Sequence, residues 1–389
     1  MKKFNVFLKL AEFQYNYYPA IILTFLILTI LFGFYGVNMG FESNINNEFP
    51  KNYDVFKYSD YITDNFAGTE GILVNIKIDE NIIENPINEV TDKRVIQALY
   101  RLDGLLREES KIVEVQSLAL PFKYVQLYPL TTEVTNEIIS KSGVIKDVFL
   151  SEDKSATLMV IYPQKLSGKE TIDNFVKLVE DKIQRADFPY GTSVSITGSP
   201  VLKSDLTTYL ENDFLTTIII AVVFISLLLW IIMKKLTKAL LVMFPLLLGI
   251  VWFSGLVVIL GFKLSISTVA TGAMILGLGV EYSIFIYTKF VHNIKDSYEE
   301  NDDKKILDSI KGAVGTTGRA TVGSAMTTIA AFLALGISEI PMIQNLGFVS
   351  AIGISSVLIL CIVFNPCIFV LIEKIKSIKK NNRGDLNVK

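Results

Sequence analysis

Six long apolar segments constrain what this chain can fold into more than any other feature of its sequence. A helix that crosses a bilayer needs about 20 predominantly apolar residues. Runs of this kind occupy residues 19–37, 214–233, 239–260, 264–290, 320–337 and 343–372. They predict six transmembrane helices. Because 20% of the residues are nonetheless charged, a sizeable part of the chain is expected to lie in water.

The first apolar run has a competing interpretation as the apolar part of a cleaved signal peptide. The residues that follow it, VNMGFESN, do not resemble the small-residue site at which such peptides are cut. We therefore interpret residues 1–37 as an N-terminal segment followed by a retained first transmembrane helix.

Residues 38–213 contain no run long enough to span a membrane, and they predict a soluble α+β domain inserted between helices 1 and 2. Alternating apolar residues predict strands, and apolar residues at helical spacing predict helices. Strands are expected at residues 71–78, 111–116, 144–150, 157–162 and 192–197, and helices at 91–109, 133–141 and 168–186. This order is close to the split βαβ arrangement of a ferredoxin-like domain. Nothing in the domain resembles a catalytic site.

Positive charges predict the orientation. Lysines and arginines crowd the N-terminal segment (Lys2, Lys3 and Lys9), the loops at 234–238 and 289–319, and the tail from Lys374, whereas the turns at 261–263 and 338–342 hold only Lys263. The positive-inside rule then places both termini in the cytoplasm and residues 38–213 outside it, in the cytoplasmic membrane of a cell.

The remaining chain divides into transmembrane helices 2–4 (214–290), a cytoplasmic linker (291–318), helices 5–6 (319–373) and a basic cytoplasmic tail (374–389). In the linker, Asp302 or Asp303 is expected to cap a helix with an apolar stripe made of Ile306, Leu307, Ile310 and Val314. Such a helix suits the membrane surface, and a solvated hairpin is the alternative. Asn365-Pro366 is expected to kink or end the last span.

The fourth span carries one acid, Glu281. A charged side chain at the centre of a membrane helix costs roughly 2.5–3.5 kcal/mol, so such residues face protein, find a partner or take up a proton. If Lys289 marks the inner surface, a rise of about 1.5 Å per residue places Glu281 about 12 Å deep. We predict that Glu281 couples ion movement to work, with the Tyr282 hydroxyl donating to it; the alternative is a structural polar pin between helices.

Small and hydroxyl residues surround this acid. Gly272, Gly277 and Gly279 lack side chains that would keep another helix at a distance. The fifth span offers hydroxyls at helical spacing and an arginine at its inner end, which together are candidates for a supporting relay: Ser324, Thr327, Thr328 and Arg319. For the hydroxyls, ordinary helix packing is the competing interpretation.

The sequence gives no support for ATP as the energy source. The GxxxxGK[ST] pattern is absent, and residues 167–170 (SGKE) lack both its upstream glycine and its hydroxyl residue. Residues 312–318 (GAVGTTG) follow no predicted strand, so helix packing explains their glycines. The single His292 excludes HExxH-type zinc sites, and the net charge of −2 gives no reason to expect nucleic acid. No cofactor or metal is expected, and an ion gradient remains as the energy source.

With these residues in place, the chain resembles the RND (resistance-nodulation-division) superfamily, and within it the MMPL-like exporters of hydrophobic and amphiphilic molecules. Residues 277–283 (GLGVEYS) are similar to that family's GxGxDY. Further matching residues are 312–314 (GAV), 318–320 (GRA), 324–328 (SAMTT), Pro341, Gly347 and Asn365-Pro366. The topology of one span, a porter-like outer domain and five more spans also matches.

Two departures from the family pattern matter. Glu281 stands where the family has Asp, which lengthens the acid by one methylene. The chain also holds one repeat where typical members hold two, so the resemblance implies a homodimer with twelve helices about a two-fold axis.

The resemblance implies a proton-driven exporter of lipids or other hydrophobic or amphiphilic molecules, and no enzyme. Three alternatives remain open at this point. They are a SecDF-like accessory of protein translocation, a sterol-sensing or receptor-like membrane module, and an unrecognised membrane enzyme.

Overall fold

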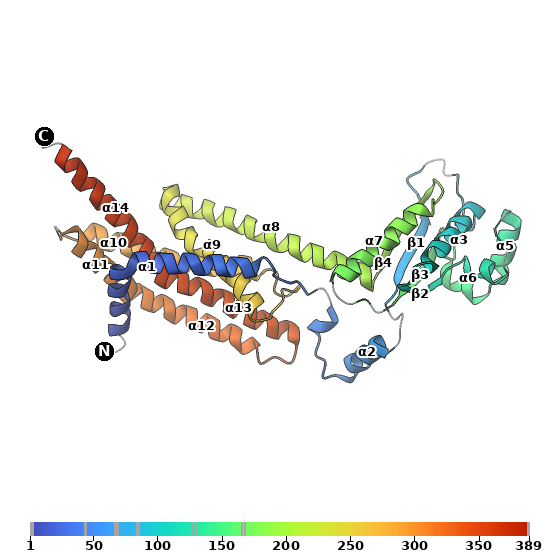
Figure 1. Cartoon of the computed structure of the whole chain (residues 1–389), viewed down its shortest axis with the longest axis horizontal. Coiled ribbons are helices and arrows are strands. Elements are labelled where there is room, and N and C mark those ends of the chain that lie inside the picture. Colours follow the sequence, from blue (N-terminus) through green and yellow to red (C-terminus); the bar gives the residue numbers. More distant parts are fainter. Residues whose placement is uncertain are drawn as a thin grey trace. The chain divides into compact units, whose positions relative to one another are not determined.

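The computed structural model describes residues 4–42, 45–65, 70–82, 86–125, 128–129, 131–164, 166, 169–299 and 301–386. Lys2, Lys3, Ser167, Gly168 and the end of the basic tail lie outside these residues. The chain forms two compact units, which are described separately below (Figure 1). The membrane unit comprises Met1–Pro50 and Leu210–Lys389, and the soluble unit comprises Lys51–Tyr209.

Among the described residues, six helical segments are long and apolar enough to cross a bilayer, as predicted. They are α1 (Phe4–Gly36), α8 (Ser199–Met233), α9 (Leu236–Ile259), α10 (Thr271–Asp296), α11 (Asp302–Gly312) continued through the π-helix η2 (Ala313–Gly318) into α12 (Arg319–Leu335), and α13 (Pro341–Ile359) continued through the π-helix η3 (Leu360–Phe364) into α14 (Asn365–Leu386). The chain is thus a multi-pass membrane protein.

Close backbone packing joins the first and third spans. A Cβ atom on Gly255 of α9 would lie 2.7 Å from the Cα of Phe32 in α1, so only glycine allows this approach. Trp252, one turn away, stacks on Phe25 with ring centroids 5.1 Å apart. Its indole N–H donates a 2.9 Å hydrogen bond to the Thr29 hydroxyl. A small residue and an anchored aromatic residue therefore fix α1 along α9.

The fourth span begins later than predicted. Its helix starts at Thr271 and not at residue 264, because the preceding residues are held in other hydrogen bonds. The Leu264 N–H donates to the Gly40 carbonyl (3.0 Å), and the Glu42 N–H donates to the Leu264 carbonyl (2.7 Å). The Ser265 N–H donates to the Thr268 hydroxyl (2.7 Å), which closes a turn. These contacts compete with the helix that the apolar run alone predicts.

The linker helix packs within the membrane unit. The expected cap at Asp302 or Asp303 is wrong, because Asn301 accepts hydrogen bonds from the N–H groups of Asp303 (2.9 Å) and Lys304 (3.2 Å). The predicted stripe is present: Ile306, Ile310 and Val314 are buried in the core of this unit, and Leu307 is half-buried. Since α11 contacts α1, α10 and α14, the solvated hairpin is not what the chain forms.

The soluble unit contains, within its described part, a four-stranded sheet in the order β2-β3-β1-β4, with every neighbouring pair antiparallel. Its elements are α2 (Asp54–Asn65), β1 (Ile72–Ile78), α3 (Lys93–Arg107), β2 (Ile112–Gln116), α4 (Leu120–Tyr124), α5 (Thr132–Lys141), α6 (Val144–Phe149), β3 (Ala156–Pro163), α7 (Lys169–Arg185) and β4 (Thr192–Gly198). The helix α3 joins β1 to β2 across the intervening β3, which is the predicted split βαβ arrangement.

One face of the sheet carries the core of this unit. Ile72, Val74 and Ile76 alternate along β1 and are fully buried. They share their core with the apolar faces of α3 and α7, which include Leu99 and Phe175. The predicted helical faces therefore cover the predicted strand face, as the two periodicities require.

The expected strand at residues 144–150 is wrong. Residues Val144–Phe149 form α6, after Gly143 turns the chain with a φ of +54°. Val144 and Val148 lie four residues apart, as on one face of a helix, and both are exposed, whereas Phe149 is buried. Only Leu150 pairs with β3, through an isolated bridge to Thr157. A short apolar run does not distinguish the two periods, and tertiary packing selected the helix.

Candidate functional site

Glu281 lies on the outside of the membrane unit. It occupies the middle of α10, its side chain is exposed, and no other side chain among the described residues forms a hydrogen bond or an ion pair with it. The polar pin between helices of one chain is therefore not what the structure shows. A carboxylate on an exposed face at this depth needs protein, water or a proton to compensate it.

Tyr282 points the other way and connects two spans. Its side chain is only 3% exposed, in the core of the membrane unit. The Thr328 side chain of α12 lies near the Tyr282 hydroxyl, and the Thr328 hydroxyl donates to the Ser324 carbonyl of its own helix. The structure thus brings together one predicted coupling residue and one predicted relay residue, and these belong to the fourth and fifth spans.

The other predicted relay residues do not form a chain of hydrogen bonds to Glu281 within the described structure. The hydroxyls of Thr327 and Thr328 both donate to the Ser324 carbonyl of their own helix, at 2.6 and 3.3 Å. Ser324 and Thr327 are exposed, as is Arg319 at the start of α12. These side chains therefore give the outer face of α12 a polar character.

The three glycines of α10 have different surroundings. A Cβ on Gly272 would lie 2.8 Å from Ile218 Cδ1, and a Cβ on Gly279 would lie 2.7 Å from Leu246 Cδ2. Both are closer than real Cβ contacts, so these positions hold other helices near α10. A Cβ on Gly277 would meet no atom within 4 Å. Among the described residues, Gly277 therefore does not serve the helix packing predicted for it.

Small and polar residues are exposed on two spans, and we call these residues together the open face. On α10 it comprises Gly277 and Glu281, one turn apart, and on α12 it comprises Gly323, Ser324 and Thr327, all exposed. A Cβ on Gly323 would also meet no atom within 4 Å. Such residues are typical of helix–helix contacts in membranes, yet no described part of this chain covers them.

A buried hydrogen-bonded group behind Tyr282 was missed by the sequence reasoning. The side-chain amide of Asn365 in α14 donates to the Ser283 hydroxyl of α10 (2.8 Å). Ser283 in turn donates to the Val242 carbonyl of α9 (2.8 Å). Asn365 and Ser283 are fully buried. The residue next to Tyr282 is therefore tied to the third and sixth spans at once.

Pro366 explains a second missed contact. Proline has no backbone N–H, so the carbonyl four residues earlier loses its helical partner. That carbonyl belongs to Ile362, and the buried Gln14 side chain of α1 donates to it at 2.7 Å. Of the two alternatives predicted for Asn365-Pro366, a kink or an end of the span, the end is wrong, since the helix continues through the π-helical turn of η3 into α14. The unpaired carbonyl that Pro366 implies was the available sequence signal for Gln14.

Comparison with known proteins gives two similar sequences. The chain is 26% identical over 382 residues to a putative membrane protein of Methanocaldococcus jannaschii, and the match covers 97% of both chains. It is 28% identical over 119 residues to the membrane protein YdfJ of Bacillus subtilis, which covers 31% of this chain and 16% of YdfJ.

A solved structure and a family profile complete the comparison. The hedgehog release protein Disp from the water bear Hypsibius dujardini matches with a TM-score of 0.66 and 13% identity, which establishes a shared fold. The match covers 94% of this chain and 49% of the Disp chain, so this chain spans about half of Disp. The profile of the MMPL family matches residues 58–386.

Proposed function

The chain belongs to the MMPL family, and from this premise we propose that it is a proton-driven exporter of lipids or other hydrophobic or amphiphilic molecules, which works as a homodimer in the cytoplasmic membrane. Glu281 is the proton-carrying group in this proposal. The observation that carries it is the position of Glu281 on an open face within an apolar span, with no hydrogen bond or ion pair to another described side chain.

The energetics favour proton uptake at this position. Burying an ionised carboxylate in a membrane is unfavourable, so covering Glu281 with protein favours its neutral form, and contact with water favours the ionised form. A conformational change that alternates the two environments therefore binds and releases a proton. Each proton that enters along the gradient supplies about 2.3 kcal/mol per 100 mV of membrane potential.

A second copy of the chain is the covering protein in this proposal. Gly277 and Gly323 leave room for the backbone of another helix, and the hydroxyls of Ser324 and Thr327 can pair across an interface. The half-length match to Disp supports pairing of two copies about a two-fold axis. The two Glu281 side chains then share one interface, where two negative charges in close proximity repel each other.

The buried contacts offer a route from the acid to the rest of the unit. Tyr282 follows Glu281 and reaches Thr328 of α12. Ser283 follows Tyr282 and connects to Val242 and Asn365. A shift of α10 on protonation thus moves groups in four spans. In the proposal this movement is passed to residues 38–213, outside the cytoplasm, where cargo is handled.

The test of coupling uses proteoliposomes with an imposed pH gradient, a fluorescent lipid analogue as cargo and an internal pH dye. We expect Glu281→Gln to remove both gradient-driven lipid export and the matching proton flux. Glu281→Asp, which restores the acid that the family pattern carries, retains both. Glu339→Gln, the same change in the exposed turn before α13, serves as the matched control. Export by Glu281→Gln at the wild-type rate contradicts the proposal.

The test of the homodimer uses disulfide cross-linking between copies. The buried native thiols, Cys361 and Cys367, are first replaced by alanine. Single cysteines at Gly277 and Gly323 on the open face are expected to form dimers under oxidation. A single cysteine at Leu240, exposed on α9, is the matched control and remains monomeric. If neither open-face position cross-links above the level of the control, the homodimer is excluded.

A further inference from the structure

A basic cavity lies at the end of the membrane unit where α9 begins. It has a volume of about 590 Å³ and lies between α9, α10 and α14. Tyr287, Phe290 and Phe369 form an aromatic part of its wall, and the Phe290 and Phe369 rings stack 5.1 Å apart. Its charged lining consists of four lysines and one glutamate: Lys235, Lys238, Lys295, Lys376 and Glu373.

Most of this positive charge has no partner in the described structure. Lys376 pairs with Glu373 at 2.6 Å. Lys235, Lys238 and Lys295 form no hydrogen bond or ion pair with other described side chains. The first turn of α9 adds to this potential, because Lys235 provides no side-chain cap and the N-terminal N–H groups of a helix favour anions. The cavity is therefore complementary to a negatively charged group.

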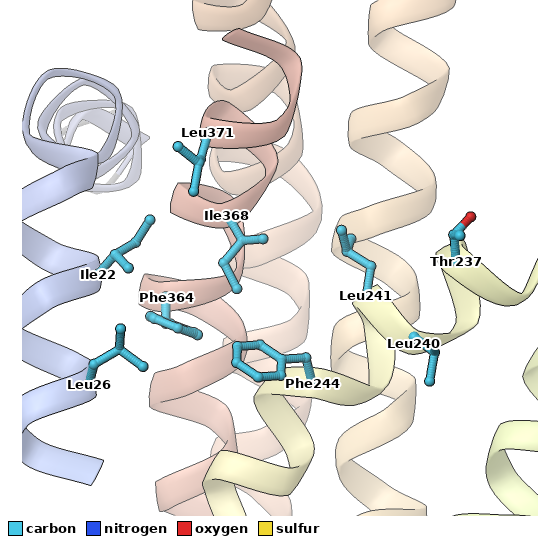
Figure 2. A pocket seen from close by; sticks show the side chains of 9 residues that line it. All are labelled: Ile22, Leu26, Thr237, Leu240, Leu241, Phe244, Phe364, Ile368 and Leu371. Carbon is cyan, nitrogen blue, oxygen red and sulfur yellow. The ribbon is translucent and has the colours of Figure 1, made fainter. Parts of the chain in front are cut away.

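An apolar groove shares two lining residues with this cavity. It has a volume of about 420 Å³ and lies between α1, α9 and the η3–α14 segment, as Figure 2 shows. Ile22 and Leu26 line one side, and Phe244, Phe364 and Ile368 line the other parts. Two residues of the first turns of α9, Thr237 and Leu241, line both the groove and the basic cavity. The two spaces thus adjoin across α9.

We propose that the cavity and the groove together bind an anionic phospholipid. Its phosphate lies among Lys235, Lys238 and Lys295, and an acyl chain passes Leu241 into the groove. Both volumes fall within the range of roughly 300–1,000 Å³ that ligand sites occupy. Lipid tails are as apolar as leucine side chains, so the groove alone selects no lipid. The lysines supply the selection, and basic pockets between membrane helices suit anionic headgroups.

This site is separate from the proposed coupling site. The α10 residues that line the cavity (Tyr287, Phe290, Val291, Ile294 and Lys295) follow Glu281 by 6 to 14 residues, which is about 9–21 Å along the helix at a rise of about 1.5 Å per residue. Binding of an anionic lipid here is independent of transport, and each proposal can fail without the other.

The experiment measures binding of tail-labelled fluorescent phosphatidylglycerol and phosphatidylcholine to the full chain in neutral detergent. We expect phosphatidylglycerol to bind more tightly, and the triple variant Lys235→Gln/Lys238→Gln/Lys295→Gln to weaken its binding about a hundredfold, at about fivefold per lysine. The matched control is Lys9→Gln/Lys289→Gln/Lys379→Gln, which removes the same charge from lysines outside the cavity. It is expected to change the affinity less than threefold, roughly the effect of half a lysine.

Three outcomes overturn the proposal. Equal affinity for the two lipids shows that the site does not select by charge. An equal loss of phosphatidylglycerol affinity in the control triple variant shows that the lipid is attracted by general surface charge and not by the cavity. Displacement of the labelled lipid by glycerol 3-phosphate, at concentrations similar to those of the lipid, identifies a site for soluble phosphates.

A second variant, Leu241→Trp, blocks the passage into the groove with all charges retained and is expected to weaken phosphatidylglycerol binding. Unchanged binding excludes the acyl chain from the groove. Unchanged tryptophan fluorescence of the triple variants, from Trp230 and Trp252 of this unit, shows that they are folded.

Discussion

Asp103 in the soluble unit and Glu281 in the membrane unit are both carboxylates on helices with apolar neighbours, yet their surroundings differ. Asp103 is fully buried and contacts Arg107 Nε at 2.8 Å and the Lys123 ammonium. Glu281 is exposed and has no such partner in the described structure. A buried charge with partners is fixed by them, whereas a charge on an open face remains available to a proton or a second copy. The difference indicates that Asp103 stabilises the fold and that Glu281 has a functional role.

The largest expected effect comes from removing the partnered acid. Asp103→Ala leaves the Lys123 ammonium, whose pKa burial already lowers, without its carboxylate. Breaking a fully buried ion pair costs about 3–5 kcal/mol, and because the Lys123 and Arg107 side chains are 24% and 40% exposed and can be rehydrated, we expect a loss at the lower end, about 3 kcal/mol. Regional hydrogen exchange measures the loss. Glu137→Ala, which removes an exposed partner of Lys141, is the matched control and is expected to leave exchange unchanged.

The same measurement sharpens the comparison at Glu281. Glu281→Gln is expected to leave hydrogen exchange in α9, α10 and α13 as slow as in the wild type, because Glu281 forms no side-chain hydrogen bond or ion pair with another described side chain. Faster exchange in these helices shows that Glu281 has a structural role after all.

Two glycines test the difference between packed and open helix faces. Gly255→Ala forces α1 away from α9, because the new Cβ would lie 2.7 Å from Phe32 Cα. We expect a loss of about 1–3 kcal/mol in the stability of the membrane unit, which is typical of overpacking. Gly277→Ala meets no atom and is expected to be neutral for the single chain. Denaturation of detergent-solubilised protein, followed by tryptophan fluorescence, distinguishes the two; equal effects contradict the contrast.

A smaller effect is expected at the contact with Ile362. Gln14→Leu introduces an apolar side chain of similar size and removes the amide that donates to the Ile362 carbonyl. An unsatisfied buried group costs about 1–3 kcal/mol, and the π-helical turn can relax part of this, so we expect about 1–2 kcal/mol. Gln344→Leu, which removes a half-buried hydrogen bond to Gly336, is the control and is expected to cost less. A larger loss for the control argues against the special role of Pro366.

The smallest effect concerns an exposed acid and pH. Hydrogen bonds from the Ser151 and Ser155 side chains and the Ser155 N–H lower the pKa of Asp153 to about 2, below its ordinary 3.8. A lowered pKa stabilises the fold above pH 3.8, and this contribution is lost as the pH falls toward 2. We therefore expect Asp153→Asn to melt slightly below the wild type at pH 6, and the gap to close between pH 4 and 2. A gap that is constant over this range contradicts the lowered pKa.

Much of the architecture was predictable because its signals are local. Apolar runs long enough for a bilayer predicted the six spans, and the alternation at Ile72, Val74 and Ile76 predicted a strand buried on one face. The motif around Glu281 led to the family that the profile match shows. The prediction failed at Val144–Phe149 and at the start of α10, where contacts with other segments outweighed the local pattern.

The candidate site was predictable in residue type and less so in arrangement. Glu281 and Tyr282 stand out as polar residues in an apolar span, but their neighbouring positions do not reveal that one points outward and the other inward. The contact between Tyr282 and Thr328 and the hydrogen bonds among Val242, Ser283 and Asn365 join residues distant in sequence. Such contacts are set by how helices pack, which depends on side chains from several spans at once.

The sequence by itself determined the class of protein, the number of spans, the split βαβ order and the unusual acid, because hydrophobic length and periodicity are properties of single segments. Only the tertiary structure decided which faces are covered. In the folded chain Glu281, Gly277 and Gly323 are exposed, and Lys235, Lys238 and Lys295 line one cavity. The Gln14 side chain donates a hydrogen bond to the Ile362 carbonyl, which loses its helical partner because of Pro366. Burial and proximity depend on the whole chain, and the functional proposals made here rest on them.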